Sequence, residues 1–313
     1  MAPRAGPDRS TPVGAHAGGG RKGEGELIYS ARPLWVDRMW GSLRRGDKTV
    51  GELWWVYQDG EGSASLRSST GETTTVNALV EDGLLPEMGG RYPLLVKTLH
   101  TARRLSVQVH PGKDGGDLCK EETWVVLSAR PGSWLLAGLL PRATPEELGR
   151  ALSEGEIEGL LARLEMEPGQ AVHIPPGTVH ALGGGLEVLE IQRNCDVTYR
   201  LFDWNRMGTD GKPRELHLEK GLRAIRPPGS ERPSPVERRE SLETGDLYRL
   251  ERLEGRQEVR MEPGSVLFLE EGRVERYDSG EPPVAGRTWR CLLADKGGGS
   301  VELRGVATMA RLS

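Results

Sequence analysis

The sequence contains few aromatic residues and few cysteines. Aromatic residues make up 5% of the chain and phenylalanine occurs twice, whereas tryptophan occurs eight times. Large amphipathic rings of this kind suit either a barrel core or a sugar-facing pocket. Cys119, Cys195 and Cys291 are widely separated and form no C-x-x-C pair. They therefore indicate reduced, buried thiols and not a disulfide framework.

The sequence also lacks long hydrophobic runs and an excess of positive charge. No uninterrupted apolar stretch approaches the ~20 residues that a membrane helix needs, and the N-terminus carries no secretory-type apolar run. The formal net charge is -4 and the isoelectric point is about 6.0. No general positive field would draw the chain to nucleic acid or anionic lipid. We therefore expect a cytoplasmic protein without nucleic-acid or membrane partners.

Glycine and proline are plentiful, with 43 and 21 residues, and they separate short β-prone segments. Examples of these segments are ELWWVYQ at 52–58, RLSVQVH at 104–110 and ETWVVLS at 122–128. Short strands divided by turn residues are typical of antiparallel barrels and sandwiches. The sequence therefore predicts an all-β protein.

One segment departs from the strand pattern. Between Thr144 and Met166, leucine and isoleucine recur at roughly helical spacing. Thr144 matches an N-cap, Pro145 the first helical position and Glu147 the partner of a capping box. These features predict a small helical insertion between strands.

Two stretches lack the periodicity of either element. The N-terminal residues are mainly Gly, Pro, Ala, Arg and Ser, and the segment at 226–240 is proline-rich and charged. We predict a disordered tail at 1–25, a catalytic domain at 26–226 with the helical insertion at about 142–166, a linker at 227–240, and a smaller β domain at 241–313.

Four residues form a candidate metal site. Gln108 and His110 lie two apart in a segment that alternates as a strand, so both side chains should leave one face about 6–7 Å apart. Glu122 opens the next predicted strand, and His180 follows a Pro-Pro-Gly turn. Imidazole and carboxylate together suit Zn, Fe, Mn, Co or Ni, and a site with few protein ligands leaves room for substrate.

A single histidine in a strand is usually structural, so the spacing around His180 matters. GQAVHIPPGTVHAL at 169–182 resembles the second cupin motif, with Gly169, Pro175, Gly177 and His180 in place. The terminal Asn of that motif is Gly184 here. The glycines and the proline shape a tight turn that delivers His180 inward. His173 matches no ligand position, and we assign it to packing.

Further segments look like successive signature blocks of the short bacterial mannose-6-phosphate isomerases. The blocks are RMWGS at 38–42, PLLVKTLHTARRLSVQVHP at 93–111, CKEETWVVL at 119–127, HIPPGTVHAL at 173–182, EIQRNCDVTYRLFDWNR at 190–206 and RELHLEK at 214–220. They occur in the order of that family. The resemblance implies a cupin (RmlC-like jelly-roll) barrel with a second, smaller β domain.

The resemblance also implies a site. It places one divalent metal, usually zinc in such enzymes, on His110, Glu122 and His180, with Gln108 as a further ligand. The substrate would be a small sugar phosphate, mannose 6-phosphate, converted to fructose 6-phosphate through an enediolate. Residues that the resemblance assigns to catalysis are Lys120, Asp196 and Arg200, and those assigned to substrate binding are Ser106 and Lys97.

Within this mechanism Lys120 is the candidate base, with Glu190 as the alternative. Asp196 would transfer a proton during ring opening, and it would share a strand face with Arg200 if 196–200 were extended. Arg200 would neutralise the enediolate or bind phosphate.

Other functions remain open at this stage. An isomerase of another phosphorylated or free aldose, a non-catalytic sugar-binding cupin, and a different metal cupin such as a dioxygenase would share the barrel. The oligomeric state is not predicted by any of these patterns.

Overall fold

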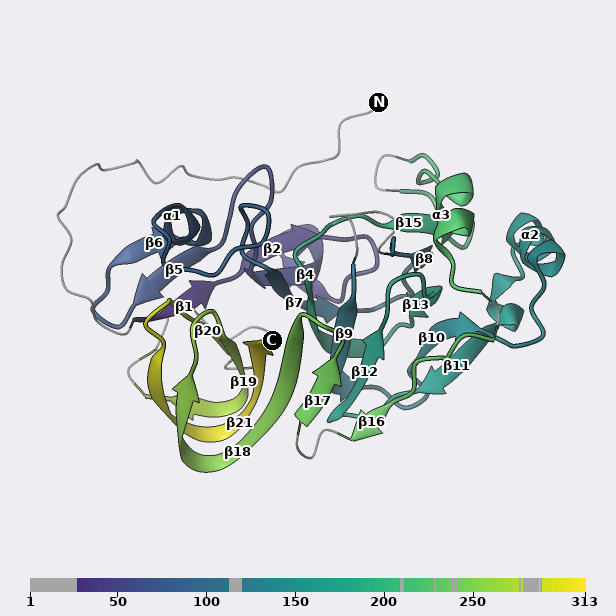
Figure 1. The fold of residues 1–313 in the computed structure, drawn as a ribbon. Coiled ribbons are helices and arrows are strands. Elements are labelled where there is room, and N and C mark those ends of the chain that lie inside the picture. The colour runs from purple at the N-terminus through teal and green to yellow at the C-terminus, as the bar shows by residue number, and fades with distance from the viewer. Residues whose placement is uncertain are drawn as a thin grey trace.

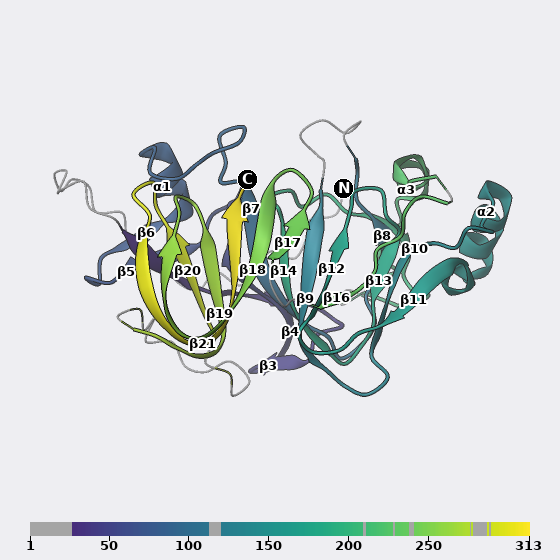
Figure 2. The same ribbon diagram turned by 60° about the horizontal axis from the view of Figure 1, so that its bottom comes forward.

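The residues that the structure describes form three antiparallel sheets (Figures 1 and 2). The structure, a computed structural model, describes residues 27–112, 120–208, 211–227, 229–237, 241–275, 277, 287 and 289–313. The predicted tail at 1–25 and Cys119 lie outside these residues. The mainly β architecture predicted from the sequence is confirmed.

The central sheet runs in the order β16-β12-β9-β14-β7-β4-β2, with β3 paired to β4. Its strands are β2 (Leu34–Asp37), β3 (Leu43–Arg45), β4 (Lys48–Val56), β7 (Leu94–His100), β9 (Glu122–Ala129), β12 (Gln170–Ile174), β14 (Leu186–Arg193) and β16 (Val236–Glu237). The five-stranded sheet runs β11-β10-β13-β8-β15. Its strands are β8 (Val107–Val109), β10 (Trp134–Leu139), β11 (Leu161–Glu165), β13 (His180–Leu182) and β15 (Tyr199–Phe202).

The C-terminal sheet runs β17-β18-β21-β19-β20-β1-β5-β6. Its strands are β1 (Ile28–Arg32), β5 (Ser65–Ser68), β6 (Thr73–Thr75), β17 (Ser241–Thr244), β18 (Tyr248–Met261), β19 (Val266–Val274), β20 (Arg290–Ala294) and β21 (Gly299–Leu312). Three strands of the N-terminal part thus extend this sheet, a pairing that the predicted domain boundaries do not include. Strand β16 likewise falls inside the predicted linker and pairs with β12.

The central sheet is covered on both faces because its strands alternate apolar residues toward each side. Trp124, Val126 and Val188 point into a barrel closed by the five-stranded sheet, where they pack with Leu135 and Leu182. The residues between them point the other way. Val125, Leu189 and Ile191 pack with Tyr248 and Phe268 of the C-terminal sheet. The central sheet is therefore the shared wall of two cores.

Three short α-helices lie outside the sheets: α1 (Val76–Glu81), α2 (Pro145–Glu154) and α3 (Leu218–Ala224) (Figure 1). Helix α2 and the 3₁₀ turn η2 (Ile157–Leu160) fall in the predicted insertion. The capping box between Thr144 and Glu147 is present, and Gly155 ends α2 in the left-handed conformation. Among the described helices, none is long and apolar enough to cross a membrane.

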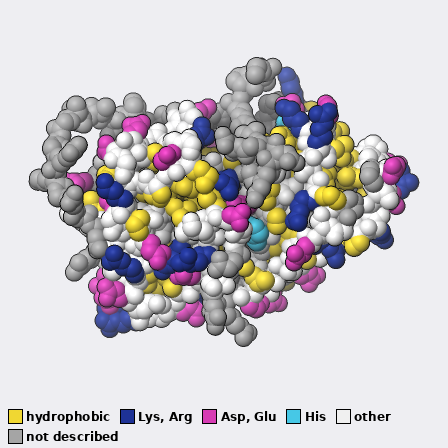
Figure 3. Space-filling model, viewed as in Figure 1, with side chains coloured by type: hydrophobic (Ala, Val, Ile, Leu, Met, Phe, Trp, Pro, Cys, Tyr) yellow, Lys and Arg dark blue, Asp and Glu magenta, His cyan; other side chains and the backbone are white. Residues whose placement is uncertain are grey.

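Acidic and basic side chains are interspersed over the face shown in Figure 3, in keeping with the small net charge of -4. Cys195 and Cys291 are buried. The described surface therefore has mixed charge.

Candidate metal centre

Three side chains from two facing sheets meet inside the barrel. Glu122 is the first residue of β9 in the central sheet, and His180 is the first residue of β13 in the five-stranded sheet. His110 directly follows β8, the neighbour of β13. The metal-binding atoms of the three lie within 4.8 Å of one another. This is the cluster predicted from the sequence.

The carboxylate of Glu122 lies between the two imidazoles. Its Oε2 is 3.3 Å from His110 Nε2, and its Oε1 is 3.2 Å from His180 Nε2. The three side chains are at most 2% exposed. The cluster is therefore almost completely shielded from solvent.

Hydrogen bonds at the far side of each ring fix which nitrogen faces the cluster. His110 Nδ1 donates to the carbonyl of Val197 at 2.9 Å, and His180 Nδ1 donates to that of Thr178 at 2.8 Å. With Nδ1 protonated in both rings, both Nε2 atoms keep a lone pair directed at Glu122. This is the tautomer that a metal-binding histidine needs.

The charges at the site favour a bound cation. Burial would raise the pKa of Glu122, but Lys120 and the two histidines outweigh burial and hold that pKa well below its usual range. Burial and the neighbouring Lys120 lower the pKa of His110 to about 4. At neutral pH the cluster thus holds one carboxylate and two neutral imidazoles. Neither oxygen of Glu122 accepts a hydrogen bond of good geometry from the described residues. The donor set therefore fits a divalent transition metal.

Gln108 lies next to this cluster. It is opposite His180 in the β8–β13 ladder and opposite Arg200 in the β8–β15 ladder, so the three side chains share one face. Gln108 Nε2 lies 3.1 Å from His180 Nε2, and Ser106 Oγ lies 3.5 Å from Gln108 Oε1. The orientation of an amide is assigned from its hydrogen bonds, and turning it over would present Oε1 to the cluster.

A second group of charges continues from the cluster along the central sheet. Lys120 Nζ is 3.0 Å from Glu122 Oε2, 3.2 Å from His110 Nε2 and 3.9 Å from Glu190 Oε1. Lys97 is opposite Glu190 in the β7–β14 ladder, and its Nζ lies 3.1 Å from Glu190 Oε1. The buried charges therefore alternate in sign outward from the candidate metal.

Glu190 is a buried carboxyl group with a raised pKa next to the candidate metal centre. Burial raises its pKa to about 7, against the opposing charge of Lys97. Burial would lower the pKa of Lys97, but Glu190 and Glu52 outweigh it and raise that pKa. A carboxyl group that titrates near neutral pH is a candidate proton carrier. The sequence suggested Glu190 only as an alternative base, because its burial depends on strands distant in the chain.

Asp196 and Arg200 do not share a strand, and the sequence prediction on this point is wrong. Strand β15 begins at Tyr199, and Asp196 is exposed in the irregular segment before it. Asp196 nevertheless lies close enough to help raise the pKa of Lys97. Arg200 is half-buried and donates from Nη1 to the carbonyl of Glu215 at 2.8 Å.

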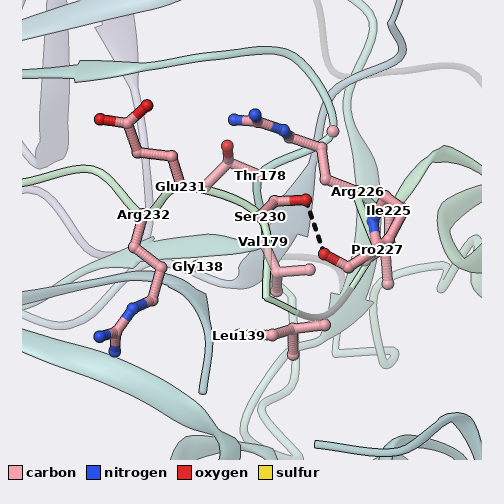
Figure 4. A pocket seen from close by; sticks show the side chains of 11 residues that line it. Gly138, Leu139, Thr178, Val179, Ile225, Arg226, Pro227, Ser230, Glu231 and Arg232 are labelled. Carbon is pink, nitrogen blue, oxygen red and sulfur yellow. Dashed lines mark hydrogen bonds between the residues drawn. The ribbon is translucent and has the colours of Figure 1, made fainter. Parts of the chain in front are cut away.

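A small cavity of about 20 Å³ lies against the turn before His180 and not at the cluster itself. Figure 4 shows Thr178, Arg226, Ser230 and Arg232 around it. None of the three candidate ligands lines it. The cavity lies between this turn and residues 225–227 and 230–232 and has room for about one water.

The antiparallel barrel and its buried cluster of two histidines and one carboxylate define a mainly β protein with a candidate metal centre. Comparison with known proteins is more specific. The family model for the phosphomannose isomerase type I catalytic domain matches residues 40–125.

Two bacterial relatives match this chain over a longer stretch. Mannose-6-phosphate isomerase ManA of Bacillus subtilis is 34% identical over 213 residues, which cover 63% of this chain and 67% of the relative. Mannose-6-phosphate isomerase of Streptococcus mutans is 31% identical over 215 residues, covering 61% and 67%. The aligned region spans about two thirds of each relative. The chain belongs to the type I phosphomannose isomerase family.

The fold agrees with solved structures. The crystal structure of mannose 6-phosphate isomerase from Bacillus subtilis superimposes with a TM-score of 0.70 at 24% identity, covering 91% of this chain and 99% of that one. A structure from Archaeoglobus fulgidus gives a TM-score of 0.64 at 20% identity. At these identities the likeness concerns the fold, which is that expected from the sequence.

Proposed function

We propose that this chain interconverts mannose 6-phosphate and fructose 6-phosphate with one divalent metal, zinc, held by His110, Glu122 and His180. The observation that carries the proposal is the buried cluster of these residues, with both Nε2 lone pairs directed at the carboxylate of Glu122. Membership of the phosphomannose isomerase family supplies the substrate class.

Isomerisation moves a proton between C2 and C1 of the open-chain sugar. Loss of the C2 proton gives a cis-enediolate with one negative charge shared by O1 and O2, the hydroxyl proton passes from O2 to O1, and return of the carbon-bound proton to C1 gives the ketose. When bound, the metal supplies Lewis-acid stabilisation of that charge. The buried setting strengthens this effect, because little solvent is present to screen it.

Lys120 and Glu190 are the candidate proton carriers. Lys120 Nζ lies 3.0 Å from the carboxylate of Glu122, and its amine is the candidate acceptor of the C2 proton. Glu190 is 3.9 Å from Lys120 and has a pKa of about 7. We assign the base to Lys120, with Glu190 as the group that would take over if Lys120 were dispensable.

The remaining predicted residues bind and orient the substrate. Arg200, in the same row as Gln108 and His180, supplies a positive charge for the enediolate or the phosphate. Lys97 on β7 and Ser106 just before β8 are buried, and both would contact the sugar phosphate. Asp196 is exposed nearby, and we assign it to ring opening.

A coupled assay with mannose 6-phosphate tests the proposal. Activity should be lost after chelation and should return when Zn²⁺ is added back. An enzyme that is inactive with mannose 6-phosphate but active with another aldose would favour the alternative of a related isomerase. A chain that binds metal and sugar phosphate without turnover would favour a non-catalytic cupin.

A further inference from the structure

The backbone around Arg200 is bonded to one downstream segment. The amide of Arg200 donates to His217 Nδ1 at 3.1 Å, and the amide of His217 donates to the carbonyl of Arg200 at 2.8 Å. The guanidinium donates to the carbonyl of Glu215 at 2.8 Å. The segment at 214–217 therefore sets both the strand position of Arg200 and the direction of its side chain.

That segment is held in turn by Asp203, three residues after Arg200. The carboxylate of Asp203 is 5% exposed and accepts two hydrogen bonds from Arg214, one of them from Nε at 2.7 Å. It also accepts from Arg206 Nη2 at 2.6 Å. A buried carboxylate bridging two guanidinium groups fixes both geometries, because each bond is charge-assisted.

The same group of residues reaches the loop before β8. Arg206 Nη1 donates to the carbonyl of Arg104 at 2.5 Å, and Trp204 Nε1 donates to that of Leu105 at 2.6 Å. Trp204 and Asn205 adopt left-handed φ values of 57° and 53°, which return the chain toward Asp203. Non-glycine residues rarely adopt this conformation unless surrounding contacts hold it. Asp203 thus ties the segment of Arg200 to the loop that leads into Ser106.

We propose that Asp203 is a positioning residue for Arg200, acting through its ion pairs with Arg214 and Arg206. Its hydrogen bonds to Arg214 and Arg206 connect it to Arg200 through the segment at 214–217, and we expect its effect on turnover to follow this path. The kinetic part of this inference rests on the proposed function, whereas the structural part does not.

The test compares Asp203→Asn with Glu302→Gln. Glu302 is the control because its carboxylate also bridges two arginines, Arg256 and Arg304, at a more exposed position on the C-terminal sheet. Asp203→Asn should lower kcat/KM about 10–100-fold at unchanged zinc content, and Glu302→Gln should leave both unchanged. Equal kcat/KM in the two variants would overturn the proposal.

A double-mutant cycle distinguishes positioning from general destabilisation. Added to Arg200→Ala, Asp203→Asn should cause no further loss of kcat/KM, because Arg200 is no longer there to be placed. Full additivity of the two losses would overturn the proposal. If Asp203→Asn does not fold, Arg214→Lys takes its place in the cycle. This variant keeps the positive charge but cannot form both hydrogen bonds to Asp203, and the same two outcomes for kcat/KM decide the test.

Hydrogen exchange gives a readout that does not require activity. The amide of His217 should exchange faster in Asp203→Asn than in Glu302→Gln, because its segment is released. Unchanged protection at His217 would contradict the proposal. An inactive wild-type protein with the exchange result intact would instead refute the proposed function alone.

Discussion

The amide of Gly177 donates a hydrogen bond of 2.9 Å to the carbonyl of His110, so the turn before one candidate metal-binding histidine is bonded to the other. Gly177 has a φ of 77°, and a Cβ there would lie 2.7 Å from the carbonyl oxygen of Ala224. The turn requires glycine for both reasons. The geometry of the cluster thus depends on a residue that cannot bind metal.

Replacing Gly177 by alanine should therefore weaken metal binding. The added methyl group has to push the turn away from Ala224, which moves Thr178 and the His180 ring that is bonded to it. We expect zinc affinity to fall about 10–100-fold, as for other changes to groups that orient a metal ligand. Gly132→Ala is the control, because Gly132 has the same φ of 77° and no atom within 4 Å of the added Cβ. Equal zinc affinities in the two variants would show that the turn does not place His180.

Replacing Lys120 by methionine should remove turnover without removing the metal. The substitution keeps the length of the side chain and deletes the amine that lies 3.0 Å from Glu122. A missing proton carrier costs about 10²–10⁴-fold in rate. Lys220→Met, at an exposed position of α3, is the control. Substantial activity in zinc-loaded Lys120→Met would transfer the role of base to Glu190.

Protonation of Glu190 should make kcat/KM fall on the acidic side of the pH profile. Its pKa of about 7, raised by burial, means that it is protonated below that pH and loses the negative charge that faces Lys97 and Lys120. We expect kcat/KM of the wild type to fall as the pH decreases through about 7. In Glu190→Gln the residual activity should lack this limb. An unchanged pH profile in the variant would assign the limb to another group.

The pair of Glu52 and Arg38 should contribute to stability in a pH-dependent way. Glu52 is buried, which would raise its pKa, but Arg38, Lys97 and the Trp54 indole lower it to about 2 from 4.5. A lowered carboxyl pKa stabilises the fold above the unfolded value and loses this contribution as the pH falls through the folded value. Glu52→Gln should lower the free energy of unfolding by about 2–3 kcal/mol at neutral pH. The difference from the wild type should shrink between pH 5 and 2, and a constant difference would contradict this account.

A change in helix α2 of the insertion should alter the stability of the protein without altering its activity. Thr144→Ala deletes the side-chain cap of α2, whose hydroxyl accepts from the amide of Glu147 at 3.2 Å. We expect a loss of about 1 kcal/mol in the free energy of unfolding with unchanged kcat/KM. Thermal unfolding and the coupled assay measure the two quantities. A fall in kcat/KM would mean that α2 influences the site.

Local signals in the sequence predicted much of this structure. The capping box at Thr144 and the turn before His180 were visible because residues a few positions apart determine them. The strand opened by Glu122 was visible for the same reason. Asp196 was misplaced in a strand because β15 begins only at Tyr199; just before it, the carbonyl of Val197 accepts from the His110 ring at the end of the neighbouring strand β8, a contact distant in sequence.

Contacts between distant segments were not predictable in the same way. Strand β1 pairs with β20, and no pattern within 28–32 indicates a partner more than 250 residues away. The burial of Glu190 between Lys97 and Trp124 arises only when three strands align. Asp203 stood in a signature block without an assigned role, because its partners Arg206 and Arg214 are ordinary charged residues until the chain folds.

Zinc titration of the chelated protein tests the metal centre most directly. Isothermal titration should give one Zn²⁺ per chain in the wild type and in Lys120→Met, and binding at least 100-fold weaker in Glu122→Gln, which loses the carboxylate between the two imidazoles. Equal zinc affinity in Glu122→Gln and the wild type, or no zinc binding by the wild type, would contradict the assignment of His110, Glu122 and His180 as the metal site.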